Sequence, residues 1–171
     1  MNLQREFPPN SFEFLPVIST LNVSSEELVD GSPLAERFLV SGRNASRDLG
    51  WDAGPESAKS YVVGCFDTDP PTPGGMWHWL VVDVPPNVRE LTTGEGVGSP
   101  TSLGRGLRSD VGVVGYTEAA PPLSGHEHRY VFVLYAEGIE HLNVGNGTSP
   151  FLAGFYLTLN SLARGFLTGL A

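Results

Sequence analysis

The sequence predicts a mainly β protein: an antiparallel β-sandwich formed by one domain, residues 1–171, with a single helix near the end of the chain. Three observations lead to this prediction. The 171 residues include 21 glycines and 14 prolines, and this density of turn-forming residues favours many short strands over a helical bundle. Three Val-rich runs are typical of buried strands. Only one segment shows helical periodicity.

The first third of the chain is expected to contribute short or irregular elements. Prolines interrupt the apolar clusters of residues 1–27, so we expect an N-terminal arm with one or two short edge strands. Asp30 and Gly31 form a turn signal. Residues 34–40 are apolar enough for a strand, whereas residues 43–55 are polar and are predicted to be irregular.

The central strands and the helix have the clearest patterns. Residues 60–66, 77–84 and 129–136 are rich in β-branched and aromatic side chains with little alternation, as expected of strands buried on both faces. The Gly- and Ser-rich residues 92–110 are predicted to be a loop. A helix is predicted for about residues 150–166, after a Ser-Pro start, because apolar side chains recur there at three- and four-residue spacing. These side chains are Leu152, Phe155, Tyr156, Leu159, Leu162, Ala163 and Phe166.

Charge and cysteine content exclude several classes of protein. The formal net charge is −9 and no basic stripe is present, which excludes generic binding to a nucleic-acid backbone. Cys65 is the only cysteine and lies in an apolar run, so no internal disulfide can form and we expect a buried, unreactive thiol. No apolar stretch is long enough to span a bilayer, and the N-terminus lacks the apolar core of a signal peptide. These features predict a cytoplasmic protein.

Two histidines and one aspartate stand out as candidate site residues. His78 lies between two tryptophans at the start of a predicted strand, and His128 directly precedes another strand. A side chain at a strand end can face a cleft while the sheet holds its backbone, although either histidine can also be purely structural. Asp67 follows a buried strand, where a carboxylate either ends the strand in a turn or leaves the sheet beside the histidines. His126 and His128 would share a strand face, but no Glu follows on that strand, so we expect no bound metal.

Three segments, in this order, resemble motifs of the phosphatidylethanolamine-binding protein family, also called the Raf kinase inhibitor family, and of its bacterial branch in particular. An acidic, Pro-containing turn at residues 67–71 (DTDPP) precedes a Trp- and His-rich strand start at residues 77–82 (WHWLVV). Residues 115–122 (GYTEAAPP) then lead through a short Gly-containing loop to residues 128–130 (HRY). The resemblance covers about residues 28–168. It implies the fold of that family, an antiparallel β-sandwich with a C-terminal helix.

The resemblance also implies a small anion pocket at one end of the sandwich, which four side chains would line and four would shape. The lining residues are Asp67, His78, His128 and Tyr130, and the shaping residues are Asp69, Trp77, Pro121 and Pro122. Imidazoles and a phenol can donate hydrogen bonds to a phosphate, and a carboxylate can orient one imidazole. The chain departs from the motifs at Thr68 and Glu118, and Arg47 replaces a motif proline. These departures bear on phosphate affinity more than on the fold.

Three functions remain open at this point. The first is non-catalytic binding of a small anion or of a phosphorylated or polar head group, with a regulatory role like that of the kinase inhibitors and lipid-head-group binders of the family. The second is an enzyme that carries out cyclisation or elimination on a small organic substrate in a biosynthetic pathway. Its acid and base groups would be Asp67, His78, Glu118 and His128. The third is a scaffold with a vestigial pocket. We expect no cofactor and no nucleic-acid partner, and the resemblance makes a homodimer plausible.

Overall fold

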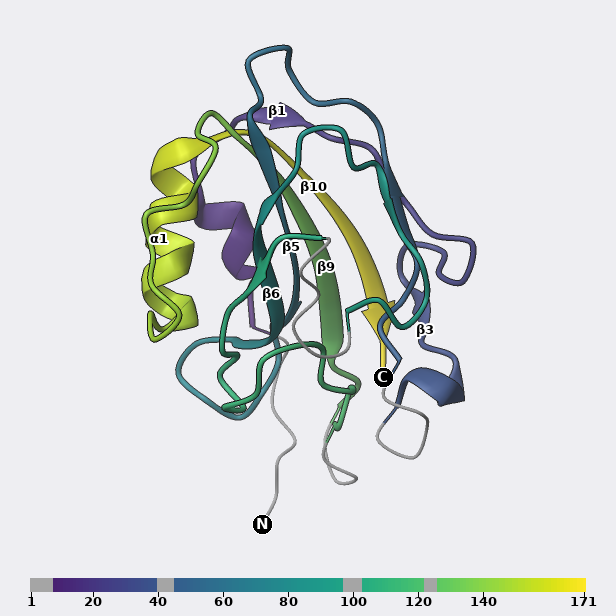
Figure 1. Cartoon of the computed structure of the whole chain (residues 1–171). Helices are drawn as coiled ribbons and strands as arrows, with labels where there is room; N and C mark the ends of the chain where they lie inside the picture. The colour runs from purple at the N-terminus through teal and green to yellow at the C-terminus, as the bar shows by residue number, and fades with distance from the viewer. Residues whose placement is uncertain (1–7, 40–44, 97–102, 122–125) are drawn as a thin grey trace.

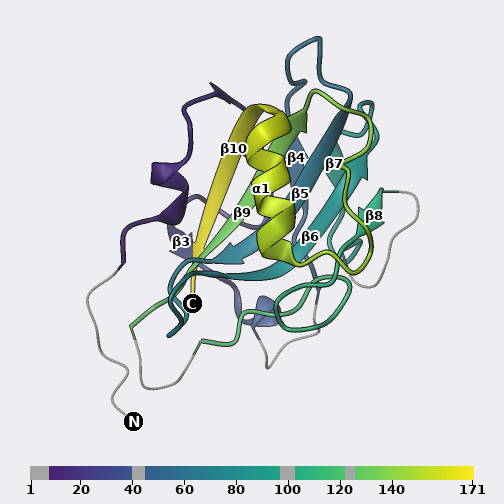
Figure 2. The same cartoon turned by 90° about the vertical axis from the view of Figure 1, so that its left-hand side faces the viewer.

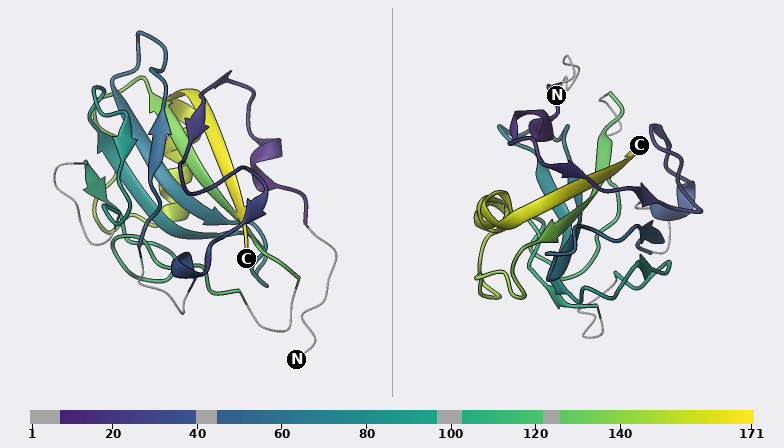
Figure 3. Two further views of the ribbon diagram at one scale, coloured as in Figure 1. Left: turned by 90° about the vertical axis from the view of Figure 1, so that its right-hand side faces the viewer. Right: turned by 90° about the horizontal axis from the view of Figure 1, so that it is seen from above.

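The computed structural model describes residues 8–39, 45–96, 103–121 and 126–171, which form two β-sheets and one α-helix (Figure 1). Seven strands form the larger sheet and three form the smaller sheet. The larger sheet lies between the smaller sheet on one face and helix α1 (Pro150–Asn160) on the other, so the molecule has three layers (Figure 3). The predicted fold class, a mainly β sandwich with one helix, is confirmed.

The strand order of the larger sheet is β1-β10-β9-β5-β6-β8, and β3 also pairs with β10. The bounds are β1 Ser19–Thr20, β3 Ser32–Pro33, β5 Ser60–Asp67, β6 Met76–Val84, β8 Arg105–Gly106, β9 Arg129–Glu137 and β10 Ser161–Leu170. The smaller sheet has the order β2-β4-β7, with bounds β2 Val23–Ser24, β4 Leu49–Trp51 and β7 Glu90–Leu91. Two short 3-10 helices are η1 (Ser11–Phe14) and η2 (Glu36–Phe38).

The three predicted central strands are confirmed as β5, β6 and β9. They pair antiparallel in the order β9-β5-β6 and are buried along nearly their whole length. Because both faces of the larger sheet are covered, these strands show no alternation of apolar and polar residues. One edge departs from the prediction: β10 runs parallel to both β1 and β3, so the sheet is mixed rather than wholly antiparallel.

The predicted helix begins where expected. Ser149 is the N-cap, its Oγ accepts a hydrogen bond from the backbone N–H of Leu152 at 3.3 Å, and Pro150 is the first helical residue. Such a hydroxyl satisfies one of the backbone donors that a helix start leaves unpaired. The helix packs across the larger sheet, as Figure 2 shows with α1 in front of the strands.

The helix is shorter than predicted, because it ends at Asn160 and the last part of the predicted helix belongs to β10. Strand β10 lies close to the N-terminal segment, and a Cβ atom at Gly165 would be only 2.4 Å from the backbone oxygen of Leu21. Glycine allows this approach, and the contact stabilises an extended chain where the spacing of Phe166 suggested a helix. The prediction of a helix over residues 161–166 is therefore wrong.

A hydrophobic cluster covers each face of the larger sheet. The cluster between the two sheets includes Trp51, Tyr61, Cys65, Trp79, Tyr116, Tyr130 and Phe132. The cluster between the larger sheet and α1 includes Phe12, Val62, Trp77, Val133, Tyr135, Ala153 and Leu157. Side chains that alternate along β5, β6 and β9 therefore enter two different cores.

Three irregular segments differ in part from the predictions. A strand is predicted for residues 34–40, of which residue 40 lies outside the described residues, but residues 34–39 contain η2. This 3-10 helix buries Phe38, with the guanidinium of Arg47 3.8 Å from its ring centroid. Residues 43–55 are predicted to be irregular; residues 43 and 44 lie outside the described residues, and residues 45–55 contain β4, which is too short for a period-two pattern to reveal it. Residues 92–110, predicted to be a loop, contain the two-residue strand β8, and part of the segment lies outside the described residues.

Several smaller predictions can be compared directly with the structure. Gly31 has a φ angle of +72°, as the predicted turn requires, and Cys65 is completely buried. Burial raises the pKa of the Cys65 thiol, which makes it unreactive as expected. Residues 8–27, the described part of the predicted N-terminal arm, contain η1, β1 and β2. Among the described residues, no helix is long and apolar enough to cross a membrane.

Candidate functional site

A cavity of about 470 Å³ opens at the end of the larger sheet where β5 ends and where β6 and β9 begin. Four residues named from the sequence line it: Asp67 ends β5, His78 lies near the start of β6, and His128 and Tyr130 lie at the start of β9. The other lining residues are Pro70, Pro71, Met76, Val111, Val113, Thr117, Glu118 and Ala120. The antiparallel order β9-β5-β6 brings these strand ends to one place.

A bulge in β6 directs His78 into the cavity. Cys65 of β5 pairs with Trp79, and Phe66 pairs with Trp77, so β6 has one residue more than β5 at this point. A bulge can direct two successive side chains to the same face. His78 accordingly lines the cavity while Trp79 packs between the two sheets on the same side.

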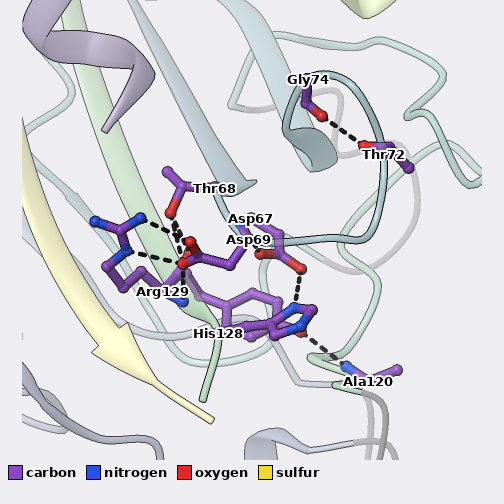
Figure 4. A network of polar contacts seen from close by, with 9 residues as sticks. Asp67, Thr68, Asp69, Thr72, Gly74, Ala120, His128 and Arg129 are labelled. Carbon is purple, nitrogen blue, oxygen red and sulfur yellow. Dashed lines mark hydrogen bonds and ion pairs between the residues drawn. The ribbon is translucent and has the colours of Figure 1, made fainter. Parts of the chain in front are cut away.

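Asp67 and His128 form a buried pair in the cavity (Figure 4). Nδ1 of His128 lies 2.8 Å from Oδ2 of Asp67, and the two side chains are only 5% and 2% exposed. The other carboxylate oxygen, Oδ1, accepts a hydrogen bond from the backbone N–H of Asp69 at 2.8 Å. An ionised Asp67 holds a proton on Nδ1 of His128. This leaves Nε2 to accept a hydrogen bond when the ring is neutral or to donate one when it is protonated.

His78 is the second imidazole of the cavity, and neither of its buried ring nitrogens forms a well-aligned hydrogen bond with a described residue. Its ring lies edge-on to that of Tyr130, with 5.3 Å between the centroids. Burial lowers the pKa of His78, and the nearby Asp67 carboxylate and backbone groups of Thr117 and Glu118 offset this only in part, so the ring is neutral at pH 7. The neutral ring offers one donor and one acceptor in the cavity that it lines.

Asp69 and Arg129 form an ion pair beside the cavity (Figure 4). Oδ2 of Asp69 accepts hydrogen bonds from the backbone N–H and from Nε of Arg129, both at 2.8 Å, and Oδ1 accepts one from Nη2 at 2.7 Å. The hydroxyl of Thr68 donates to the same carboxylate at 2.8 Å. Burial by itself would raise the pKa of Asp69, but the hydrogen bonds from Arg129 and Thr68 outweigh burial and lower it. The pair fixes the turn that positions Asp67.

The residues that the resemblance assigned to the walls of the pocket are placed differently. Asp69 does not line the cavity, because its carboxylate is bound to Arg129. Trp77 faces the opposite side of the sheet, since side chains alternate before the bulge, and lines a groove between η1 and α1. Pro121 is not among the lining residues, and Pro122 lies outside the described residues.

Sequence reasoning missed an apolar wall of the cavity. Met76, the first residue of β6 and two residues before His78, is part of this wall. Val111 and Val113 belong to it through a turn centred on Gly112, which has a φ angle of +86°. The pattern Asp-Val-Gly is a turn signal that predicts the bend but not that its tip faces the cavity. Glu118, where the chain departs from the family's motif, is half-buried and lines the cavity.

No metal centre is apparent in the described ranges, which contain no group of three or more His, Cys, Asp or Glu side chains arranged to hold a metal ion. His126 and His128 lie on the same side of the chain, with 5.7 Å between their ring centroids. The arrangement of the cavity is instead that of two imidazoles and two carboxylates beside an apolar wall.

The sequence is similar to those of bacterial proteins of one family. A family model described as phosphatidylethanolamine-binding protein matches residues 24–171. The UPF0098 protein YbhB of Escherichia coli K12 is 39% identical over 158 residues, which cover 88% of this chain and 99% of YbhB. The UPF0098 protein YbcL of the same strain is 34% identical over 158 residues, which cover 88% of this chain and 86% of YbcL.

The fold is also similar to those of solved structures. The crystal structure of Escherichia coli YbcL, described as a new member of the mammalian PEBP family, matches with a TM-score of 0.82 at 32% identity and covers 89% of this chain and 98% of YbcL. The structure of the Chlamydia trachomatis homologue CT736 matches with a TM-score of 0.76 at 26% identity, covering 90% and 97% of the two chains. The sequence comparisons and the structure comparisons thus indicate the same family.

Proposed function

This chain belongs to the phosphatidylethanolamine-binding protein family, and we propose that its cavity binds a small anionic or polar head group without turnover. The observation that carries the proposal is the state of His78. Both of its ring nitrogens are buried in a cavity of about 470 Å³ and form no well-aligned hydrogen bond with a described residue, although backbone groups of Thr117 and Glu118 lie near the ring. Because buried polar groups in folded proteins are almost always hydrogen-bonded, this pair of atoms calls for a polar ligand.

The charges of the lining favour a monoanion over a dianion. Asp67 and Glu118 contribute carboxylates, whereas His78 is neutral at pH 7 because burial lowers its pKa. Each negative charge on a ligand is repelled by both carboxylates, so a dianion experiences about twice the repulsion of a monoanion. Acetate or a singly charged phosphate ester therefore suits the cavity better than fully ionised phosphate.

One observation also favours an enzyme. Glu118 lines the same cavity as the Asp67–His128 pair, so carboxylates from two different segments face a common space together with two imidazoles. Such a set can accept a proton at one point of a small organic substrate and donate one at another, as cyclisation and elimination require. Conversion of such a substrate by the protein, abolished by Glu118→Gln, would support this second function.

Calorimetric titration with acetate between pH 5 and 8 tests the binding function. We expect affinity to rise as the pH falls, because an imidazolium donates from both nitrogens and adds a positive charge. Since burial lowers the pKa of His78 from its ordinary value of 6.5, the rise should continue below pH 6.5. His78→Ala should weaken acetate binding about 10- to 100-fold at pH 5.5, the usual cost of a hydrogen bond to a charged group.

A matched control is available at the other end of the sheet. His141 is 81% exposed and does not line the cavity, so His141→Ala should leave acetate affinity unchanged. Acetate affinity that is independent of pH and the same for wild type and His78→Ala would show that the cavity is not an anion site.

A further inference from the structure

We propose that a chloride ion binds inside the protein, between the two sheets, where Arg47, Tyr116 and Trp79 hold it. The site is separate from the cavity at the ends of β5, β6 and β9, because none of these three residues lines that cavity. Two features of the described residues lead to it. One is a buried cation without a counterion, and the other is a set of buried hydrogen-bond donors without an acceptor.

Arg47 is a completely buried cation. Its guanidinium lies 3.8 Å from the ring centroid of Phe38 and 5.9 Å from that of Phe132. Nη1 donates a hydrogen bond to the backbone oxygen of Glu27 at 2.7 Å, whereas Nε and Nη2 have no partner among the described residues. Burial lowers the pKa of Arg47, but a guanidinium stays protonated in proteins. A full positive charge is therefore held in the core, which is costly unless a negative charge pairs with it.

The described residues do not supply that negative charge. The carboxylate of Glu27 pairs with Arg37 at 2.6 Å and forms no ion pair with Arg47. Cys65 and Tyr116 lie near enough to influence the pKa of Arg47, and either would be an anion if it lost its proton. Burial raises the pKa of the Cys65 thiol and of the Tyr116 phenol, so both are neutral at pH 8. The counterion must therefore come from the solvent.

The unpaired atoms around Arg47 are donors as well. Trp79 of β6 pairs with Cys65 of β5, which pairs with Phe132 of β9, and all three side chains belong to the cluster between the sheets. Tyr116 packs against both ends of this row, with its ring centroid 6.0 Å from that of Trp79 and 6.5 Å from that of Phe132. The Tyr116 hydroxyl and Nε1 of Trp79 are buried without a hydrogen-bond partner among the described residues. Like Nε and Nη2 of Arg47, they can donate to a common acceptor.

The missing partner is a small acceptor with a single negative charge. A water molecule can accept hydrogen bonds here but leaves the charge of Arg47 unpaired, and a dianion leaves one negative charge in excess. Chloride satisfies both the donors and the charge, and we place it above Cys65, the smallest side chain of the row. The motif of the family has a proline at position 47, so the site is a property of this chain rather than of the family.

Thermal unfolding in chloride tests the site. The protein is melted at pH 8 in mixtures of sodium chloride and sodium gluconate of constant ionic strength, since gluconate is too large for a site enclosed by aromatic rings. Above the dissociation constant, each tenfold rise in chloride should raise the melting temperature by about 3–5 °C. Arg47→Met should abolish this rise. Arg108→Met, the same change at an exposed arginine, and His78→Ala, a change in the cavity, should both retain it.

Tyr116→Phe is a second variant that keeps the proposal testable if Arg47→Met does not fold. It removes a hydroxyl that has no partner among the described residues, so the melting temperature without chloride should not fall. With chloride present, loss of a hydrogen bond to a charged group should weaken chloride affinity about 10- to 100-fold. This dependence of the effect on chloride distinguishes a ligand contact from a purely structural role of Tyr116.

Crystals grown in bromide provide a direct readout, because bromide replaces chloride and is located by its anomalous scattering. We expect a peak in contact with Nε or Nη2 of Arg47. Melting temperatures that do not depend on the ratio of chloride to gluconate would overturn the proposal. The same chloride dependence in wild type and in folded Arg47→Met would also overturn it, as would bromide-grown crystals without a peak beside Arg47.

Discussion

Glu118 is the residue at which this chain differs most in charge from the motif of its family, and the structure places its carboxylate in the lining of the cavity. Because Glu118 is partly exposed, screening should reduce its repulsion of a bound monoanion to about 1 kcal/mol. Glu118→Gln should therefore tighten acetate binding about fivefold, measured by calorimetry. Glu140→Gln, which makes the same change of net charge on an exposed residue outside the cavity, should have no effect. Equal affinities for all three proteins would show that the Glu118 carboxylate does not act on the ligand.

Glu137 is a second carboxyl group in an unusual setting, at the opposite end of β9 from the cavity. It is completely buried and its Oε2 has no partner among the described residues. The hydroxyl of Ser161 lies 2.5 Å from Oε1 of Glu137 and 2.6 Å from the carbonyl oxygen of Leu157. A hydroxyl has one proton and cannot serve both acceptors, so the arrangement is complete when Glu137 is protonated. Burial raises the pKa of Glu137 to about 7, and the hydrogen bond from Ser161 offsets this only in part.

Replacing Glu137 by glutamine should change how stability depends on pH. The folded-state pKa of about 7 lies above the ordinary value of 4.5, so the stabilisation is complete below pH 4.5 and is lost as the pH rises toward 7. The loss amounts to about 3 kcal/mol. Glu137→Gln should remove this loss, as measured by urea unfolding at pH 4.5 and pH 8, whereas the exposed control Glu56→Gln should not. Parallel pH profiles for wild type and Glu137→Gln would contradict this assignment.

From the sequence, individual site residues could be proposed only where a polar side chain lies at the end of a predicted strand. Asp67, His78 and His128 were candidates because they lie at strand ends, but purely structural roles were open for each, and the resemblance to the family's motifs assigned them to a pocket. The role of His78 nevertheless depends on a bulge, which shifts the register by one residue and leaves no periodic signature. Val111 and Val113 could not be found, because an exposed valine is common and only the fold shows that these two face a cavity.

At the scale of elements, the central strands were predictable and the end of the helix was not. Long apolar runs with β-branched side chains have few alternatives, so β5, β6 and β9 follow from the sequence. The segment from Ser161 onward could continue a helix or form a strand, since its apolar residues suit both. The segment forms a strand because of contacts between distant parts of the chain, such as that of Gly165 in β10 with Leu21. Local sequence patterns carry no information about such contacts.

Gly165 offers a direct test of this account of β10. A Cβ atom there would lie 2.4 Å from the backbone oxygen of Leu21 and 2.7 Å from Cγ2 of Val23, so Gly165→Ala should force the N-terminal segment away from β10. We expect a loss of about 1–3 kcal/mol in the free energy of unfolding, measured with urea. Gly154→Ala is the matched control: beyond the backbone of its own helix turn, no atom lies within 4 Å of a Cβ added at this helical glycine, and alanine should stabilise the helix by about 0.5–1 kcal/mol. A neutral Gly165→Ala would mean that the contact with Leu21 is not tight.

At the scale of the whole molecule, the larger sheet unites the two cores and the cavity. Each of its faces is covered, and alternate side chains of the same three strands enter the cluster between the sheets or the cluster beneath α1. The ends of those strands then supply the buried residues of the cavity. Composition alone indicated the layered class through its glycines and prolines, but the mixed edge of the sheet depends on pairings between the two ends of the chain.

Because β10 comes last among the described strands, the larger sheet cannot be completed until this strand has been synthesised. β1, β3 and β9 all pair with β10, the last strand to be synthesised among those described, and the backbone of His128 pairs with Ala171 just beyond it. At about 5–20 residues per second, β1 waits on the order of ten seconds for this partner. An unpaired strand edge is a template for other chains, so the edge that β10 covers in the folded protein is open to such pairing during that interval. The cavity that contains His128 is consequently among the last parts of the molecule to mature.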